Sequence, residues 1–372
     1  MFLGEDLEVE APVSERLLKS MDTVQDIFLN WYPAQLQRIK VRANAQSAVA
    51  GRGDEKVACF FSGGVDAWYS FLKNRNRIGL LLTVKGFDIP VYDEAVWPDL
   101  LKANQRIAAE CGVPLLHVET NLRQCIDPSR PGLGKQFRGN FWGNYLHGAF
   151  LGAVGLCLQQ QWGTLIIPSS YPYISLHPWG SHPLVDRLWS NEVTEFVHDG
   201  SEANRMDKVR AIARANESLP VLRQLRVCPD HTPMRYNCGR CEKCVRTMLA
   251  LHLFKVLEKT PSFDVPLDLR TVSKMRIQPH KYVWYEEILA EALAQKNEEV
   301  ARLCRVLMRQ ERSFYREWSH FYEAAQTRTK PWAEAWTQHV NPPVLRFCRR
   351  WKRSFQKRAN WVRSLSQVGP ET

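Results

Sequence analysis

The sequence contains no apolar run near the roughly 18 residues that a membrane-spanning helix requires. Its start, MFLGEDLEVEAP, is acidic and lacks the basic-then-apolar pattern of a secretory signal peptide. A disulfide framework is not indicated either, because four of the ten cysteines are tightly clustered, as in a metal site. These absences argue against secretion and membrane insertion, and we expect a soluble, cytoplasmic protein with reduced cysteines.

The chain does have an excess of positive charge, and most of it lies near the C-terminus. The net charge is +11. Without residues 341–372 the sequence has 42 basic and 38 acidic residues, a net charge of +4. This basic tail interleaves aromatic residues with arginines, so peripheral membrane contact, nucleic acid and an acidic protein are all open as partners. A packed amphipathic helix with a solvated basic face explains the pattern as well, and the tail alone favours none of these.

A glycine turn after a buried strand is the most informative local pattern. Residues 57–61 form a continuous apolar run typical of a central strand in a parallel sheet. Ser62, Gly63 and Gly64 end this run, and apolar residues then recur at helical spacing through position 72. Such a strand-to-helix turn can bind an anion through backbone N–H groups and the serine hydroxyl. The spacing differs from GxxxxGK[ST] and no lysine follows, so the turn is not a Walker-type loop.

Strands and helices alternate after this turn. We predict strands at 78–84, 113–118 and 164–168, separated by helices at 99–111 and 145–159. This alternation indicates an α/β protein with a doubly wound parallel sheet. We expect three regions: an N-terminal extension (1–55) with a short helix at 22–29 and a short strand at 38–41, a central domain (56–250), and a helical, basic C-terminal region (251–372).

Two loops carry residues suited to ligands. Residues 132–144 place Lys135, Arg138, Asn140 and Asn144 just before a helix, where they suit phosphates or ribose. Residues 168–199 combine aromatic, histidine and charged side chains after a strand end, as expected of a pocket for a small-molecule acceptor. The helix that follows, at 205–216, is basic, and we expect one face of it to be solvated.

Four cysteines indicate a structural metal site, and they are Cys228, Cys238, Cys241 and Cys244. Two CxxC steps with a glycine after Cys238 match a tetrahedral zinc knuckle, and four thiolates leave no open position for a catalytic water. A four-thiolate iron–sulfur cluster is the alternative, and His231 is an alternative ligand.

The SGGVD motif resembles the PP-loop of the N-type ATP pyrophosphatases, which usually read SGGxDS. With C-x₉-C-G-x-C-x-x-C and Arg246 behind it, the chain is similar to 7-cyano-7-deazaguanine synthases over about residues 57–248. The resemblance implies an adenine-nucleotide hydrolase-like fold with ATP, Mg²⁺ and Zn²⁺ as cofactors. It implies that ATP contacts Ser62, Gly63, Gly64, Asp66, Val84, Lys85, Gly86, Phe87 and Asn144, with Asp66 also near Mg²⁺. Ala67 departs from the usual serine, and the chain is much longer than those synthases, so we expect a different acceptor.

We therefore expect an ATP-dependent ligase that adenylates a carboxylate or amide oxygen of a small-molecule acceptor and releases pyrophosphate. An amine, expected to be ammonia, would then displace AMP to give an amide or nitrile. Asp66, Lys85 and Arg138 are the predicted catalytic residues, the latter two stabilising charge on the α-phosphate.

Two other functions stay open. One is sulfur transfer to tRNA, which needs a reactive cysteine outside the cluster, whereas Cys59, Cys111, Cys125 and Cys157 are expected to be mostly buried. The other is a non-catalytic nucleotide-binding scaffold, for which Ala67 is the hint. The sequence does not indicate an oligomeric state.

Overall fold

The structure is a computed structural model that describes residues 1–46, 56–126, 141–215, 219–228, 236–278 and 281–309. Residues up to Met308 form one compact unit. Arg138, His231 and most of the predicted C-terminal region lie outside the described residues. The division at residues 55 and 250 remains a prediction.

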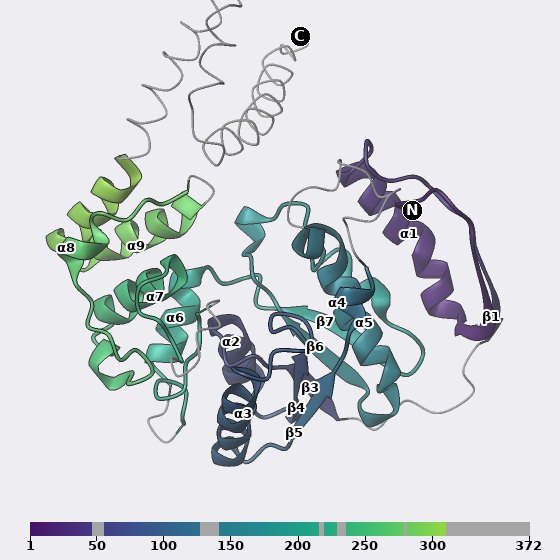
Figure 1. Ribbon diagram of the computed structural model, residues 1–372, viewed down its shortest axis with the longest axis horizontal. Helices are drawn as coiled ribbons and strands as arrows, with labels where there is room; N and C mark the ends of the chain where they lie inside the picture. Colours follow the sequence, from purple (N-terminus) through teal and green to yellow (C-terminus); the bar gives the residue numbers. More distant parts are fainter. Residues whose placement is uncertain (47–55, 127–140, 216–218, 229–235, 279–280, 310–372) are drawn as a thin grey trace, which may run out of the picture. The chain divides into compact units, whose positions relative to one another are not determined.

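A five-stranded parallel sheet forms the centre of this unit (Figure 1). Its strands are β3 (Val57–Phe60), β4 (Ile78–Lys85), β5 (Leu115–Glu119), β6 (Thr164–Pro168) and β7 (Glu195–Asp199). Their order is β5-β4-β3-β6-β7, and every neighbouring pair is parallel. The predicted α/β class and parallel sheet are confirmed.

The strand order reverses direction beside β3. From β3 the chain adds β4 and β5 on one side, and then returns to add β6 and β7 on the other. In open α/β sheets, ligands bind beyond the carboxyl ends of the strands at such a reversal. The glycine turn directly follows β3, so the topology places it at this point.

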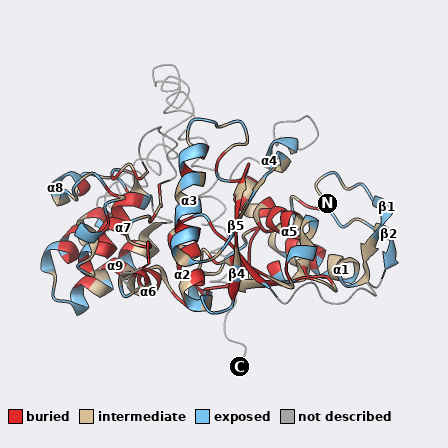
Figure 2. Ribbon diagram, turned by 90° about the horizontal axis from the view of Figure 1, so that it is seen from below, coloured by how far each residue is buried: buried red, intermediate tan, exposed pale blue. Residues whose placement is uncertain are grey.

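Helices cover both faces of the sheet, and β3 shows why the strand is apolar throughout. Val57 and Cys59 pack into the core that includes α2 (Val65–Asn74), α3 (Trp97–Cys111), α6 (Arg205–Ala213) and α7 (Glu242–Leu253). Ala58 and Phe60 pack into the opposite core, with α1 (Glu15–Trp31) and α5 (His147–Cys157). Figure 2 shows these strands as the buried centre of the molecule.

Glycines on α5 allow the helix to lie very close to its neighbours. A Cβ added at Gly152 would lie 2.9 Å from Cγ of Trp189, and one added at Gly155 would lie 2.5 Å from Cδ2 of Leu165. Larger residues would therefore push α5 away from β6 and from the segment before β7.

The N-terminal region forms its own small sheet. β1 (Leu7–Ser14) pairs in parallel with β2 (Val41–Gln46), and Ser14 caps α1 by accepting a hydrogen bond from the N–H of Leu17. The predicted strand at 38–41 is therefore displaced to 41–46, and the predicted helix at 22–29 is the middle of a longer helix.

Shorter helices complete the described chain. They are α4 (Leu122–Cys125), the π-helical turn η2 (Trp142–Leu146), α8 (Leu269–Val272), α9 (Tyr282–Ala294) and a helix over 298–309; single 3₁₀ turns are η3 (Gln159–Gln161), η4 (Tyr173–Ser175), η5 (Asp186–Trp189) and η6 (Leu257–Lys259). Among all described helices, none has the length and apolar character that crossing a membrane requires.

Candidate functional site

The glycine turn has the backbone geometry of an anion-binding turn. Gly63 has φ +74°, a left-handed conformation that favours glycine, and its carbonyl accepts a hydrogen bond from the N–H of Arg226 at 3.0 Å. Gly64 is the N-cap of α2, and in the described part of the chain no side chain caps this helix. Ser62 is exposed. The N–H groups of the first turn of α2 are thus left for a ligand, and the helix dipole favours a negative one.

A buried amide lies against the turn. Asn104 on α3 is fully buried and donates through Nδ2 to the hydroxyl of Thr83 at 3.1 Å. Its Oδ1 has no hydrogen-bond partner among the residues that the structure describes, and it lies 3.3 Å from the position of a Cβ on Gly63. This places a polar group without a partner directly beside the turn.

Two cations meet on Asp66, in the first turn of α2. Lys208 Nζ lies 2.8 Å from one carboxylate oxygen, and Arg205 Nη2 lies 3.1 Å from the other. Burial alone would raise the pKa of Asp66, but the charges of Arg205 and Lys208 outweigh burial and lower the pKa to about 2. Both oxygens are therefore occupied by cations, and this arrangement does not fit Asp66 as a magnesium ligand.

Lys208 also connects the turn to the end of β6. Its Nζ donates to the carbonyl of Ser169 at 2.6 Å, and its side chain is only 2% exposed. Ser169 follows β6, whose neighbour is β3. The cations are thus held at the carboxyl edge of the sheet, where the strand order reverses.

Lys85 lies at the end of β4, but its charge is directed to acidic side chains. Its Nζ lies 2.5 Å from Glu94 and 3.8 Å from Glu119, and the side chain is 2% exposed. Val84 and Gly86 flank it, and Gly86 turns the chain with φ +105°. The predicted strip Val84–Phe87 therefore lies beside the glycine turn through the β3–β4 pairing, with Lys85 already paired.

Phe87 packs against the helical turn that contains Asn144, through the ring of Trp142. The ring of Phe87 lies 5.1 Å from that of Trp142, in the same π-helical turn as Asn144. Asn144 is partly buried, and its carbonyl accepts a hydrogen bond from the Tyr32 hydroxyl at 3.4 Å. The end of β4 and η2 are therefore neighbours through Phe87 and Trp142, and their role in binding a nucleotide stays a prediction.

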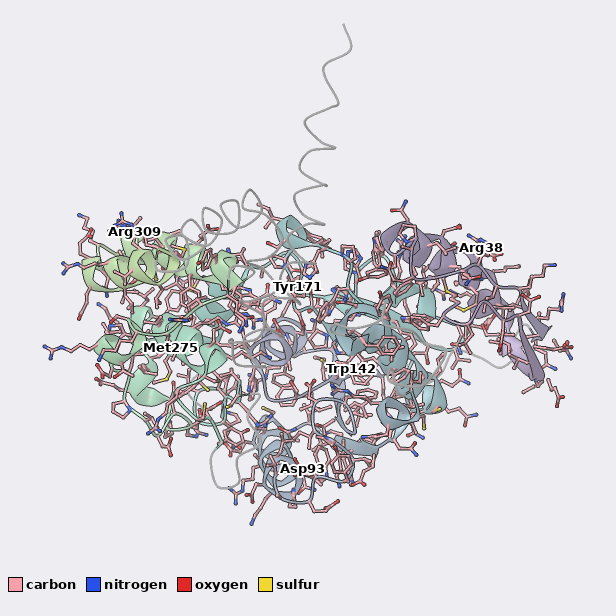
Figure 3. All side chains as sticks on the ribbon, turned by 45° about the horizontal axis from the view of Figure 1, so that its top comes forward. Arg38, Asp93, Trp142, Tyr171, Met275 and Arg309 are labelled. Atoms are coloured by element: carbon pink, nitrogen blue, oxygen red, sulfur yellow. The ribbon has the colours of Figure 1, made fainter. Side chains whose placement is uncertain are left out.

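The predicted acceptor loop is more ordered than its sequence suggested. Its last five residues form β7, and the rings of Tyr171 (labelled in Figure 3), His177 and Trp179 pack together within 6.0 Å. Deeper in the loop, Asp186 is fully buried and accepts a hydrogen bond from Ser181, and His198 Nδ1 lies 2.6 Å from its carboxylate.

The four predicted metal-ligating cysteines converge. Their sulfur atoms all lie within 4.8 Å of one another, and the pairs Cys228–Cys241 and Cys238–Cys244 are each 3.9 Å apart. A zinc ion about 2.3 Å from each sulfur in tetrahedral geometry separates the sulfurs by about 3.8 Å. The N–H groups of Cys241 and Cys244 point to Cys238 and Cys241, respectively, as in a knuckle. The donor set therefore fits a metal such as zinc.

Asn237 ties this cysteine cluster to the glycine turn. Its Oδ1 accepts hydrogen bonds from the N–H groups of Val227 and Cys228, and its Nδ2 donates to the carbonyl of Leu225. Arg226, which contacts Gly63, lies within this same segment. One cysteine ligand is thus two residues from a direct contact with the turn.

Sequence reasoning missed the cations around Asp66. The helix with Arg205 and Lys208 was expected to be solvated on one face, yet Lys208 is buried. Their spacing of three residues places both on one helix face, which is the signal that points to a shared partner.

The expectation that the remaining cysteines are buried is wrong for two of them. Cys59 is buried and Cys111 is partly buried, whereas Cys125 and Cys157 are exposed. Both exposed cysteines lie near helix ends, where fewer elements pack against them.

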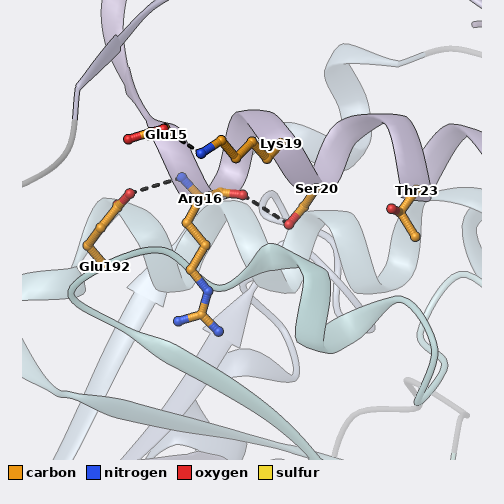
Figure 4. Close-up of a pocket in the computed structure, with 6 residues that line it drawn as sticks. All are labelled: Glu15, Arg16, Lys19, Ser20, Thr23 and Glu192. Atoms are coloured by element: carbon orange, nitrogen blue, oxygen red, sulfur yellow. Dashed lines mark hydrogen bonds and ion pairs between the residues drawn. The ribbon is translucent and has the colours of Figure 1, made fainter.

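A surface pocket elsewhere contains none of these groups. It is lined by Glu15, Arg16, Lys19, Ser20, Thr23 and Glu192 (Figure 4). Lys19 pairs with Glu15, and Arg16 donates from its N–H to Glu192 and from its guanidinium to the carbonyl of Asn191. Each of the four charged side chains in this pocket has a partner within the protein, so we assign the pocket no chemistry.

The chain was also compared with known proteins. No protein family matches it, and no curated protein does.

Proposed function

We propose that the protein is an ATP-dependent ligase of the PP-loop type, which adenylates a carboxylate or amide oxygen and releases pyrophosphate. The observation that carries this proposal is the uncapped glycine turn at the strand-order reversal, with two buried or half-buried cations held beside it by Asp66. The resemblance of SGGVD and the cysteine spacing to the 7-cyano-7-deazaguanine synthases supports it.

The proposed roles follow from the contacts. The N–H groups after Gly63 and the Ser62 hydroxyl bind the β- and γ-phosphates. Asp66 acts as a positioning residue that holds Arg205 and Lys208 toward the transferred phosphate. Because Lys85 is held by Glu94 and Glu119, we assign stabilisation of the α-phosphate to the Asp66-bound cations instead.

The chemistry is a displacement at the α-phosphate. An acceptor oxygen forms a bond to that phosphorus as the bond to the pyrophosphate oxygen breaks, which leaves an acyl or imidoyl adenylate. With an acyl adenylate, ammonia adds to the activated carbon, loses a proton, and AMP leaves with the shared oxygen to give an amide. With an imidoyl adenylate, the nitrogen loses its proton as AMP leaves with the shared oxygen, which gives a nitrile without a second amine. The protein contributes orientation and preorganised positive charge rather than a covalent intermediate.

The cysteine cluster has a structural role in this proposal. Cys228, Cys238, Cys241 and Cys244 would hold Zn²⁺, which with four thiolates supplies no open position for a substrate or water. No step is assigned to Mg²⁺ at Asp66, because that carboxylate already binds two cations.

The test is product analysis with ATP, ammonia and a panel of carboxylic acids. We expect AMP and pyrophosphate, and Asp66→Asn should lower the rate by about 100-fold or more, since it releases two cations from the reacting phosphate. Glu110→Gln is the matched control, because Glu110 is exposed and its partners are Arg223 and Gln224 rather than the cations on Asp66, and it should leave the rate unchanged.

Two results would count against the proposal. Release of ADP and phosphate would mean that ATP is cleaved between its β- and γ-phosphates and not between its α- and β-phosphates. Tight ATP binding with no cleavage for any acceptor would favour the scaffold function instead.

A further inference from the structure

Arg246 is a buried arginine with incomplete pairing. Its side chain is 6% exposed, and its guanidinium lies over the ring of Trp284, with Cζ 3.7 Å from the ring centroid. Nε lies 3.5 Å from Glu242, but Nη1 has no hydrogen-bond partner among the described residues. Leaving a charged donor buried and unpartnered is costly, so such a group calls for an anionic ligand.

Neighbouring carboxylates do not supply that partner. Glu242 is shared with Lys281, whose Nζ lies 3.1 Å away. Asp66 is shared by Arg205 and Lys208, and Glu287 accepts its hydrogen bond from the backbone N–H of Arg205. Glu242 lies within ion-pair distance of both Arg246 and Lys281, yet neither of its oxygens accepts a hydrogen bond among the described residues. The Nη1 group of Arg246 therefore has a nearby negative charge but, within the described chain, no hydrogen-bond acceptor.

Helix geometry explains how Arg246 is presented. Cys244 and Arg246 lie two positions apart on α7, which is a rotation of about 200° around the helix axis. The cysteine therefore faces the metal site, while the arginine faces α9, which carries Trp284, and α6, which carries Arg205.

This arginine also lies close to the proposed site. Arg246, Arg205 and Asp66 interact electrostatically with one another, and Tyr171 from the acceptor loop interacts with all three. Asp66 lies two residues after Gly64, in the first turn of α2, and it pairs with Arg205. Arg246 therefore lies near the helix end to which the proposed function assigns the phosphates.

We propose that Arg246, together with Arg205, forms an oxyanion-binding subsite for a phosphate or a carboxylate group. This proposal rests on the proposed function, which supplies two sources of such a group: the phosphates of the nucleotide and the carboxylate of the acceptor. A planar guanidinium stacked on an indole binds either group through paired N–H donors.

The test compares Arg246→Met with Arg210→Met in the full chain. Arg210 is the matched control, because it is also next to an aromatic ring but has both Asp207 and Glu291 as partners. Binding of inorganic pyrophosphate, and separately of benzoate, is measured by calorimetry. We expect Arg246→Met to weaken one of them by about 10- to 100-fold, as expected for a charged hydrogen bond, and Arg210→Met to change neither.

The melting temperature without ligand separates binding from structure. Arg246→Met alone leaves Glu242 with Lys281 as its only cation among the described residues, which lowers the melting temperature for a structural reason. Arg246→Met combined with Glu242→Gln removes both charges together, so a binding loss that persists in this double variant at an unchanged melting temperature belongs to the ligand. Arg246→Lys is the second variant, to be used if Arg246→Met does not fold. It keeps the positive charge but loses the planar pair of N–H donors, so it should show the same loss of binding.

Each outcome decides the question. A loss confined to pyrophosphate assigns the subsite to the nucleotide, and a loss confined to benzoate assigns it to the acceptor. Unchanged affinity in both variants, or no binding of either probe by the wild type, overturns the subsite. Since no turnover is needed, a protein that binds through Arg246 but cleaves no ATP would sink only the proposed reaction.

Discussion

At the scale of single residues, Gly86 is the position where a side chain is least tolerable. A Cβ there would lie 1.8 Å from the carbonyl oxygen of Thr120, and φ is +105°. Gly112 also has a positive φ, +68°, but has open space where its Cβ would be. An alanine at Gly112 would suffer backbone strain alone, whereas an alanine at Gly86 would suffer both backbone strain and steric overlap.

We predict that Gly112→Ala lowers the free energy of unfolding by about 1–2 kcal/mol, the cost of the left-handed conformation alone. Gly86→Ala should cost at least about twice as much, because the backbone after β4 must also move. Denaturant unfolding of both variants measures the difference. Equal losses would mean that the Thr120 carbonyl shifts freely.

Residue patterns could locate the turn but not its partners. Ser62, Gly63 and Gly64 were predictable because a buried strand and a helix bracket them. The burial of Lys208 was not, because its partner Asp66 is distant in the sequence and no local pattern records that pairing.

At the scale of elements, the cysteine cluster and the glycine turn are connected through the backbone of residues 225–228. The segment 225–228 contacts Gly63 at one end and supplies Cys228 at the other, and Asn237 holds it between. Metal binding should therefore order the backbone that packs on the turn.

We predict that the purified protein holds about one zinc ion per chain, as four-thiolate geometry requires. Removing the metal with a chelator, or replacing Cys228 with serine, should increase amide hydrogen exchange at 224–228 and weaken ATP binding. Cys157→Ser, at an exposed cysteine, is the control and should change neither. If metal loss left exchange at 224–228 unaltered, the connection would be wrong.

Two elements show where pattern reading fails. β7 was read as part of an irregular loop, because five residues of mixed polarity at the edge of a sheet resemble a loop. The helix at α5 was predicted correctly, but not that its glycines serve close packing, since that depends on which strand lies beneath it.

At the scale of the whole molecule, buried histidines should make the fold sensitive to acid. Burial lowers the pKa of His147, and it lowers that of His182 to about 4, against about 6.5 in an unfolded chain. Between these values the unfolded chain binds more protons, so stability is present above pH 6.5 and is lost as pH falls toward 4. Asp66, with a pKa of about 2, keeps its charge in this window.

We therefore predict that the melting temperature falls by several degrees between pH 6.5 and 4.5, since about 1 kcal/mol corresponds to roughly 2–4 °C at this chain length. His182→Gln should reduce that fall, and His252→Gln, on the exposed side of α7, should not. A flat profile in the wild type would show that the protonated rings are accommodated without unfolding.

The class of the fold follows from the alternating strand and helix patterns, which is why the parallel sheet could be predicted, whereas the order of its strands comes from the structure. The pairing of β1 with β2 could not, because it joins strands separated by a whole helix and exposes most of their side chains.

That small ribbon also bears on self-association. Its outer edges are not covered by another strand in the described structure, and such edges recruit strands from other molecules. Glu8 and Glu10 repel a copy of the same strand, while Pro12 lacks a donor at the point where the register shifts. Replacing Glu8, Glu10 and Pro12 with neutral residues that carry a backbone N–H would leave an unprotected strand edge, to which strands of other copies could pair.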